Sequence, residues 1–99
     1  MSVAIIYRFR AREDKSAELL TLLQQGRDFS LTVDGCEEFD VYQGKDDPHQ
    51  FVMMESWRSE QAHRAHFEKN ARGSGWLERV EGLMTEPFEP PHESGFVRR

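Results

Sequence analysis

Apolar and polar side chains alternate along three stretches of the chain, a pattern typical of β-strands. The first stretch, residues 3–10, places four apolar or aromatic side chains on the same face: Val3, Ile5, Tyr7 and Phe9. The second, residues 38–43, puts Phe39 and Val41 on one face together with Gln43. The third, residues 50–58, predicts a central strand covered on both sides, because both of its faces are apolar through Phe51, Val52, Met53 and Met54.

Helical spacing dominates three other stretches. Residues 15–29 repeat leucine at three- and four-residue intervals and end on Phe29, so they predict one amphipathic helix. Ser59 is a good N-cap for a second helix, which begins at Glu60 within the sequence SEQAHRAHFEKN. Gly-Ser-Gly at residues 73–75 interrupts the chain before a short helix at residues 76–84, whose apolar stripe is Trp76, Leu77, Val80, Leu83 and Met84.

The end of the chain is rich in proline. Residues 85–88 predict a final edge strand, which Pro87 keeps short, and residues 88–99 predict a C-terminal arm. Two phenylalanines in this segment would each forgo roughly 1.5 to 3 kcal/mol of burial if they stayed in water. We therefore expect the chain from Pro87 onward to cross to a partner subunit. The alternative is a disordered tail beyond His92.

The resulting order is β-α-β-β-α-(α)-β, which is the split βαβ pattern of a ferredoxin-like α+β sandwich. Such a fold has a four-stranded antiparallel sheet with helices on one face. Because the third strand is apolar on both faces, the other face of the sheet needs a cover. The same face of a second copy is the economical cover. We expect a homodimer in which two sheets close into a dimeric α+β barrel.

Length and charge narrow the function classes. The 99 residues suffice for a single domain, residues 1–99, and a mean hydropathy of −0.74 is low for a self-sufficient monomer. A net charge of −5 argues against nucleic acid or an anionic membrane as a partner, and no apolar run is long enough to span a bilayer. Residues 1–10 lack the features of a signal peptide, and Cys36 is the only cysteine. We expect a cytoplasmic protein without disulfides or a cysteine metal cluster.

Two histidines three residues apart, His63 and His66, project from neighbouring positions of the second predicted helix. His66 is our first candidate for a catalytic base, because imidazole titrates near neutrality and can take a proton from a phenol or an activated carbon. The alternatives are a packing role for His66 and a solvent-facing position for His63. Glu60 adds a metal-ligand spacing, but a metal site needs three or four convergent ligands, so we expect no metal.

Trp57 and Glu55 share one face of the third predicted strand. The indole of Trp57 offers a stacking surface for a planar substrate, and the alternative is a core position at the strand end. Glu55 is a candidate catalytic acid, or one half of an ion pair for which Arg8 on the first strand is the expected partner. Phe51, Met53 and Met54 are candidates for substrate contact, with packing in the core or a dimer interface as the alternative. Arg8 and Tyr42 are further candidates; the Tyr42 hydroxyl could donate to an oxyanion, and the alternative is an exposed strand tyrosine.

A family resemblance follows from several short motifs. Gly35-Cys36 stands before the second predicted strand, Glu55-Ser56-Trp57 closes the third, and Ser59 follows at a helix start that leads to Ala62 and His66. In this order and spacing, residues 3–88 resemble the antibiotic biosynthesis monooxygenase superfamily, including its quinol monooxygenase-like proteins. The resemblance implies a small dimeric α+β barrel.

Members of this superfamily carry out several reactions on one scaffold. The resemblance implies, first, an anthrone or quinol oxygenase that works without metal or flavin, and hence with no cofactor. Haem-degrading relatives have a haem-ligating histidine on the last helix, near the position of Trp76 here, so haem degradation is disfavoured. A third relative isomerises a phosphorylated autoinducer. Its helix-end pattern resembles Leu83-Met84-Thr85, but its second histidine is replaced here by residues 72–75.

We therefore expect an enzyme of the cofactor-independent monooxygenase type, which oxidises a small hydroxylated aromatic or quinol with O₂. His66, or a water that it holds, would remove the first proton. Two alternatives stay open: a non-catalytic small-molecule-binding dimer, and an isomerase of a small phosphorylated carbonyl compound. An open cavity with ordered ligand would favour the enzyme, and a closed, filled interior around His66 would favour the binding or structural role.

Overall fold

The computed structural model describes residues 2–85 and 96–97, and its centre is one antiparallel sheet in the order β2-β3-β1-β4. Three strands have eight residues and the fourth has two: β1 (Val3–Arg10), β2 (Cys36–Gln43), β3 (Gln50–Trp57) and β4 (Phe96–Val97). Strand β3 lies between β2 and β1, as the sequence predicts for a central strand. The strand order and the antiparallel pairing confirm the ferredoxin-like α+β fold.

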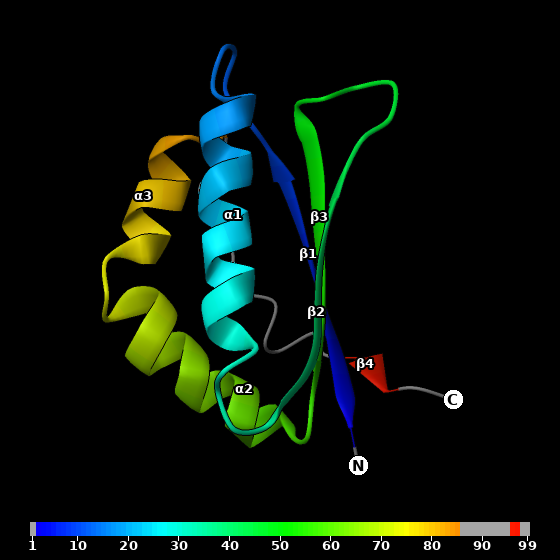
Figure 1. Ribbon diagram of the computed structural model, residues 1–99, viewed down its shortest axis with the longest axis vertical. Coiled ribbons are helices and arrows are strands. Elements are labelled where there is room, and N and C mark those ends of the chain that lie inside the picture. Colours follow the sequence, from blue (N-terminus) through cyan, green and yellow to red (C-terminus); the bar gives the residue numbers. More distant parts are fainter. Residues whose placement is uncertain (1, 86–95, 98–99) are drawn as a thin grey trace.

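All helices lie on one side of the sheet (Figure 1). They are α1 (Ser16–Ser30), α2 (Glu60–His66), the π-helix η1 (Phe67–Arg72) and α3 (Trp76–Gly82). Helix α2 begins where the sequence predicts it, because the Ser59 hydroxyl accepts a hydrogen bond of 3.1 Å from the backbone N–H of Ala62. Within the described part of the chain, no helix has the length and apolar composition that crossing a bilayer requires.

The core forms between the inner face of the sheet and the helices. Strands β1 and β3 contribute alternate residues, and the register puts Tyr7 opposite Met53 and Ile5 opposite Glu55. Helices α1 and α3 supply Leu19, Leu23 and Val80, all of them buried. The shared face predicted for β1 is therefore confirmed, because Ile5, Tyr7 and Phe9 all lie in the core.

The second predicted helix changes geometry at Phe67. Residues 59–70 predict one continuous helix, whereas the structure ends the α-helix at His66 and continues as a six-residue π-helix. A π-helix has a wider turn and occurs mostly as a short insertion at functional sites. Gly75 then adopts a left-handed φ of 83°, and this allows the chain to turn into α3.

The C-terminal expectations need correction. Residues 86–88 of the expected edge strand lie outside the described residues, and Thr85 is in a bend that follows a single bridge between Met84 and Ala11. The fourth strand is instead Phe96–Val97, which pairs with the first two residues of β1 in the same chain. For these two residues the expected crossing to a partner subunit is wrong, because the edge of β1 supplies backbone partners within the chain. The rest of the arm lies outside the described residues.

No helix of residues 2–85 covers the outer face of the sheet (Figure 1). On this face Val52 is half-buried, and Met54 is 43% exposed. The prediction that β3 is covered on both sides is thus confirmed only for its inner face within one chain.

Removing the cap of α2 tests the local origin of this helix. Ser59→Ala leaves the N–H of Ala62 without its acceptor, so the free energy of unfolding should fall by about 1 kcal/mol. Ser59→Asp is the matched control, because aspartate also accepts this hydrogen bond. Urea denaturation measures both variants, and equal losses in the two would contradict the capping role.

Candidate functional site

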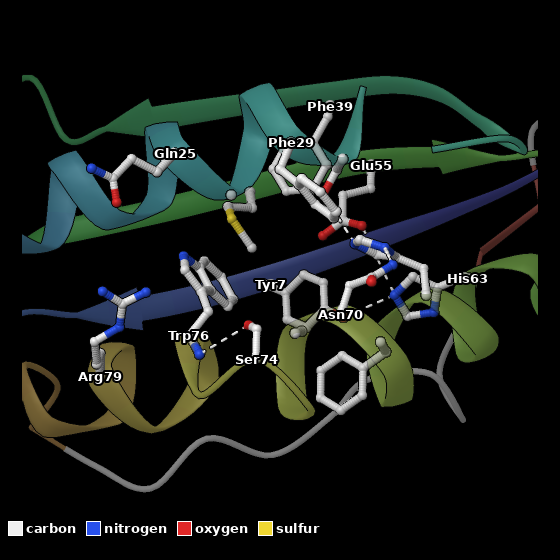
Figure 2. Close-up of a pocket in the computed structure, with 16 residues that line it drawn as sticks. Tyr7, Gln25, Phe29, Phe39, Glu55, His63, Asn70, Ser74, Trp76 and Arg79 are labelled. Atoms are coloured by element: carbon white, nitrogen blue, oxygen red, sulfur yellow. Dashed lines mark hydrogen bonds and ion pairs between the residues drawn. The ribbon is translucent and has the colours of Figure 1, made fainter. Parts of the chain in front are cut away.

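A cavity of about 240 Å³ lies between the inner face of the sheet and the helices. Its walls are mainly aromatic and apolar, and comprise Tyr7, Phe29, Phe39, Met53, Phe67 and Trp76. Figure 2 shows Glu55 and His63 toward one end of the pocket and Gln25 and Arg79 toward the other. The end with Glu55 and His63 lies inside the protein, between the sheet and α2, and is called the polar end below.

Glu55 is a carboxyl group buried on β3, with only 5% of the residue exposed. The indole N–H of Trp57 donates to its Oε1 over 2.8 Å, since both side chains point inward from the same strand. Burial raises the pKa of Glu55 to about 8, and the hydrogen bond from Trp57 opposes this shift only in part. The carboxyl group consequently holds a proton near neutral pH.

Tyr7 and His63 complete a buried polar cluster with Glu55. The Tyr7 hydroxyl lies 2.9 Å from Nε2 of His63, and the same nitrogen lies 3.9 Å from Oε1 of Glu55. His63 is only 1% exposed. Burial, with the nearby carboxyl of Glu55, raises the pKa of Tyr7, so its phenol stays neutral. The three groups lie close enough to respond to each other's protonation.

His66 is held by hydrogen bonds at both ring nitrogens. Its Nε2 lies 3.0 Å from Oγ of Ser30, and its Nδ1 lies 2.9 Å from Nδ2 of Asn70. An amide nitrogen only donates, so Nδ1 accepts and Nε2 carries the proton that it shares with Ser30. The ring also stacks on Trp57, with centroids 4.9 Å apart.

Burial lowers the pKa of His66, so the ring is neutral near neutral pH. A neutral imidazole with its lone pair on Nδ1 can accept a proton, and a protonated carboxyl can donate one. The polar end of the pocket therefore combines a base and an acid beside an apolar, aromatic chamber.

The structure brings only some of the predicted site residues together. The pocket is lined by four of them: His66, His63, Glu55 and Met53. Trp57 contacts two of these, through its hydrogen bond to Glu55 and its stacking on His66. Phe51 is fully buried in the core and does not line the cavity. Three others point to the outer face of the sheet: Arg8, Tyr42 and Met54.

Two sequence expectations about individual residues are wrong. Arg8 does not pair with Glu55, because it stands opposite Val52, whereas Glu55 stands opposite Ile5 and points to the other face. His63 does not face solvent, because α2 turns it toward the sheet and the hydroxyl of Tyr7.

Sequence reasoning missed several residues of the pocket. Alternation along β1 predicted Tyr7 on one face with Ile5 and Phe9, but its place opposite Met53 depends on the register, which the sequence did not predict. Asn70 follows His66 by four residues, a spacing that puts helical side chains in contact. Ser30 and Trp76 carried no comparable signal, since their positions depend on how α1 and α3 pack.

The metal-ligand spacing on α2 does not build a metal site. His63 and His66 both point inward to the protein partners described above, and Glu60 is exposed. Among residues 2–85 and 96–97, no group of three or more His, Cys, Asp or Glu side chains is arranged to hold a metal ion.

The fold and this pocket define a small ferredoxin-like protein with a chamber for a compact ligand. The family model of antibiotic biosynthesis monooxygenases matches residues 2–72. The chain therefore belongs to the antibiotic biosynthesis monooxygenase family. No sequence among the curated proteins matches it.

Solved structures agree with this assignment. Rv0793 from Mycobacterium tuberculosis is 29% identical with a TM-score of 0.78, and the match covers 90% of this chain and 89% of that one. A protein from Nitrosomonas europaea that carries the family's name is 25% identical with a TM-score of 0.81, covering 98% and 88%. PA3566 from Pseudomonas aeruginosa is 25% identical with a TM-score of 0.73, covering 86% and 85%.

The buried carboxyl group should leave a signature in the pH dependence of stability. The pKa of Glu55 is about 8 in the folded protein and 4.5 in an ordinary carboxyl, so the folded state keeps a proton that the unfolded state releases. Stability from this group is complete below about pH 4.5 and is lost as the pH rises toward 8. Glu55→Gln, which cannot titrate, should lose less stability than the wild type over this range.

Urea denaturation at a series of pH values measures the difference between the two proteins. His66 acts with the opposite sign, because its lowered pKa makes stability rise as the pH approaches 6.5, but this contribution is present in both. Glu78→Gln, at an exposed position of α3, is the control for loss of a carboxylate. Parallel curves for wild type and Glu55→Gln would contradict the raised pKa.

Proposed function

We propose that the protein is a cofactor-independent monooxygenase that oxidises a small hydroxylated aromatic or quinol with O₂. The product has one oxygen atom more and two hydrogen atoms fewer than the substrate, and the second oxygen atom leaves as water. The observation that carries the proposal is the open aromatic cavity beside His66, with a base and an acid at its inner end. Family membership supports the same class of reaction.

His66 is the proposed base. A substrate hydroxyl replaces the Asn70 amide at Nδ1 and passes its proton to that nitrogen, while Nε2 keeps its hydrogen bond to Ser30. The resulting imidazolium is therefore held in place as it forms. The substrate anion is electron-rich, and the low polarity of the aromatic walls strengthens its interactions with nearby donors.

Glu55 is the proposed acid. The substrate anion transfers electrons to O₂ and forms a carbon–oxygen bond, which gives a peroxide anion. The carboxyl proton of Glu55 neutralises this anion, and loss of water from the peroxide leaves the oxidised product. Trp57 holds the carboxyl in position through its indole N–H, and the proton that His66 gained balances the one that Glu55 gave.

The cavity supports the enzyme over both alternatives. A filled interior around His66 would favour a non-catalytic binding protein, whereas this chain has an open chamber there. A phosphorylated substrate needs cationic or N–H donors around its phosphate. Among the described residues that line the pocket, Arg79 is the one Lys or Arg, and it lies toward the end opposite His63 (Figure 2).

We also propose that the chain forms a homodimer through the outer face of its sheet. Cross-strand neighbours make a mixed apolar patch there, composed of Ile6, Val52, Met54 and Tyr42. Tyr42 is 52% exposed within one chain. A second copy of the same face would remove this patch from water without disturbing the helices.

Replacing the base should abolish most of the activity. His66→Gln retains a polar side chain but lacks the basic nitrogen, so the rate of O₂ consumption with a quinol should fall by about 10²- to 10⁴-fold. His49→Gln, in the loop before β3, is the matched control and should keep the wild-type rate. An oxygen electrode measures all three proteins. Uptake by the wild type no greater than that of a denatured sample would overturn the proposed reaction.

A charge at the centre of the outer patch should weaken the dimer. Met54→Lys puts an ammonium group into the proposed interface, where it would lose its hydration. The folded protomer should tolerate the change, because Met54 lies on the outer face of the sheet and is 43% exposed within one chain. Sedimentation at micromolar concentration measures the oligomeric state, with the exposed Gln24→Lys on α1 as the control. A monomeric wild type would contradict the proposal.

A further inference from the structure

Trp76 lies across the pocket at the start of α3. Figure 2 shows its indole between Tyr7 on one side and Arg79 on the other, away from the polar end at His63. The indole N–H donates to the backbone carbonyl of Leu22 in α1 over 2.8 Å. The side chain thus joins α3 to α1 and forms a wall of the cavity at the same time.

Gly26 makes room for this wall. A Cβ atom at position 26 would lie 2.7 Å from Cζ2 of Trp76, a distance that real Cβ atoms essentially never show. The edge of the indole therefore rests directly on the backbone of α1. With any other residue at position 26, either the indole or the helix would have to move.

The backbone before α3 fixes the indole from the other direction. Gly75 has a left-handed φ of 83°, and the Ser74 hydroxyl accepts a hydrogen bond of 3.2 Å from the N–H of Trp76. The side chain is thus held at its base by residues 74–75 and at its indole N–H by Leu22. A wall restrained at two points does not give way easily to a longer ligand.

From this geometry we infer that Trp76 sets the length of the ligand and selects compounds of one or two fused rings over those of three. The inference rests on the proposed function, because a ligand that reacts must reach His66 at the inner end. Trp76 stands between that end and the side chains of Gln25 and Arg79. A third ring in line with the first two would meet the indole. The cavity of about 240 Å³ is also smaller than the roughly 300 to 1,000 Å³ of sites for drug-sized ligands.

Shortening Trp76 should shift the preference toward longer substrates. The probes are 1,4-hydroquinone, 1,4-naphthohydroquinone and anthrone, which have one, two and three rings. In Trp76→Ala, kcat/KM for anthrone relative to hydroquinone should rise at least about tenfold, since even small changes in a pocket wall discriminate by such factors. Leu83→Ala removes apolar bulk near the end of α3 without lining this cavity, and should leave the ratio unchanged.

Gly26→Ala tests the position of the indole from the side of α1. The new methyl group pushes the indole away from α1, so the ratio should shift from the wild-type value with Trp76 present, and the double variant with Trp76→Ala should lose this effect. If Trp76→Ala does not fold, Trp76→Phe is used in its place, because it shortens the wall but keeps an aromatic side chain at this position. Circular dichroism establishes the folded state of each variant.

Binding separates this inference from the proposed reaction. Calorimetry with 1,4-benzoquinone, 1,4-naphthoquinone and anthraquinone measures the length preference even without turnover. Absence of oxidation by the wild type, with the expected preference in binding, would overturn the reaction and leave the role of Trp76 supported. An unchanged preference in folded Trp76→Ala, by kinetics and by binding, would overturn the role of Trp76 whether or not the protein oxidises quinols.

Discussion

The antiparallel pairing of β1 with β3 determines which side chains can meet in the pocket. Its register puts Tyr7 opposite Met53 and Ile5 opposite Glu55, so alternate residues of the two strands face the helices together. Trp57 then reaches Glu55 along the same face and stacks on His66 from α2. A shift of one residue in this pairing would turn the carboxyl toward the outer face and dismantle the site, while the backbone ladder could still form.

A carboxyl group in this position has a cost in lost hydration. Glu55 lies among aromatic side chains, where its charged form is poorly solvated, and the nearest hydrogen bond comes from an indole rather than from a cation. Retaining its proton lowers the cost of burial but leaves a polar group in an apolar setting. An aliphatic residue would avoid this cost but would leave the buried indole N–H of Trp57 without its acceptor, so the burial of Glu55 supports the proposed chemical role beside a structural one.

The strands and the helical layer were predictable because each depends on a local pattern. The alternation of side chains put Tyr7 on one face with Ile5 and put Glu55 on one face with Trp57, and the Ser59 cap located α2. The alternation of side chains would also exclude the expected ion pair of Arg8 with Glu55 if the register of β1 against β3 were known. That register depends on contacts between residues far apart in the sequence. The fourth strand could not be located, because a two-residue pairing at Phe96–Val97 has no periodicity of its own.

The π-helix η1 separates the two ends of the pocket along the chain. The histidines that form the polar end precede it, and Trp76, which forms a wall farther along the pocket, follows it. One residue of an α-helix corresponds to a rotation of about 100°. Insertion or deletion of a single residue within 67–69 would therefore rotate the side chain of Asn70 away from Nδ1 of His66. The length of η1 also determines where the turn at residues 73–75 begins, and with it how far along the pocket Trp76 stands from His66.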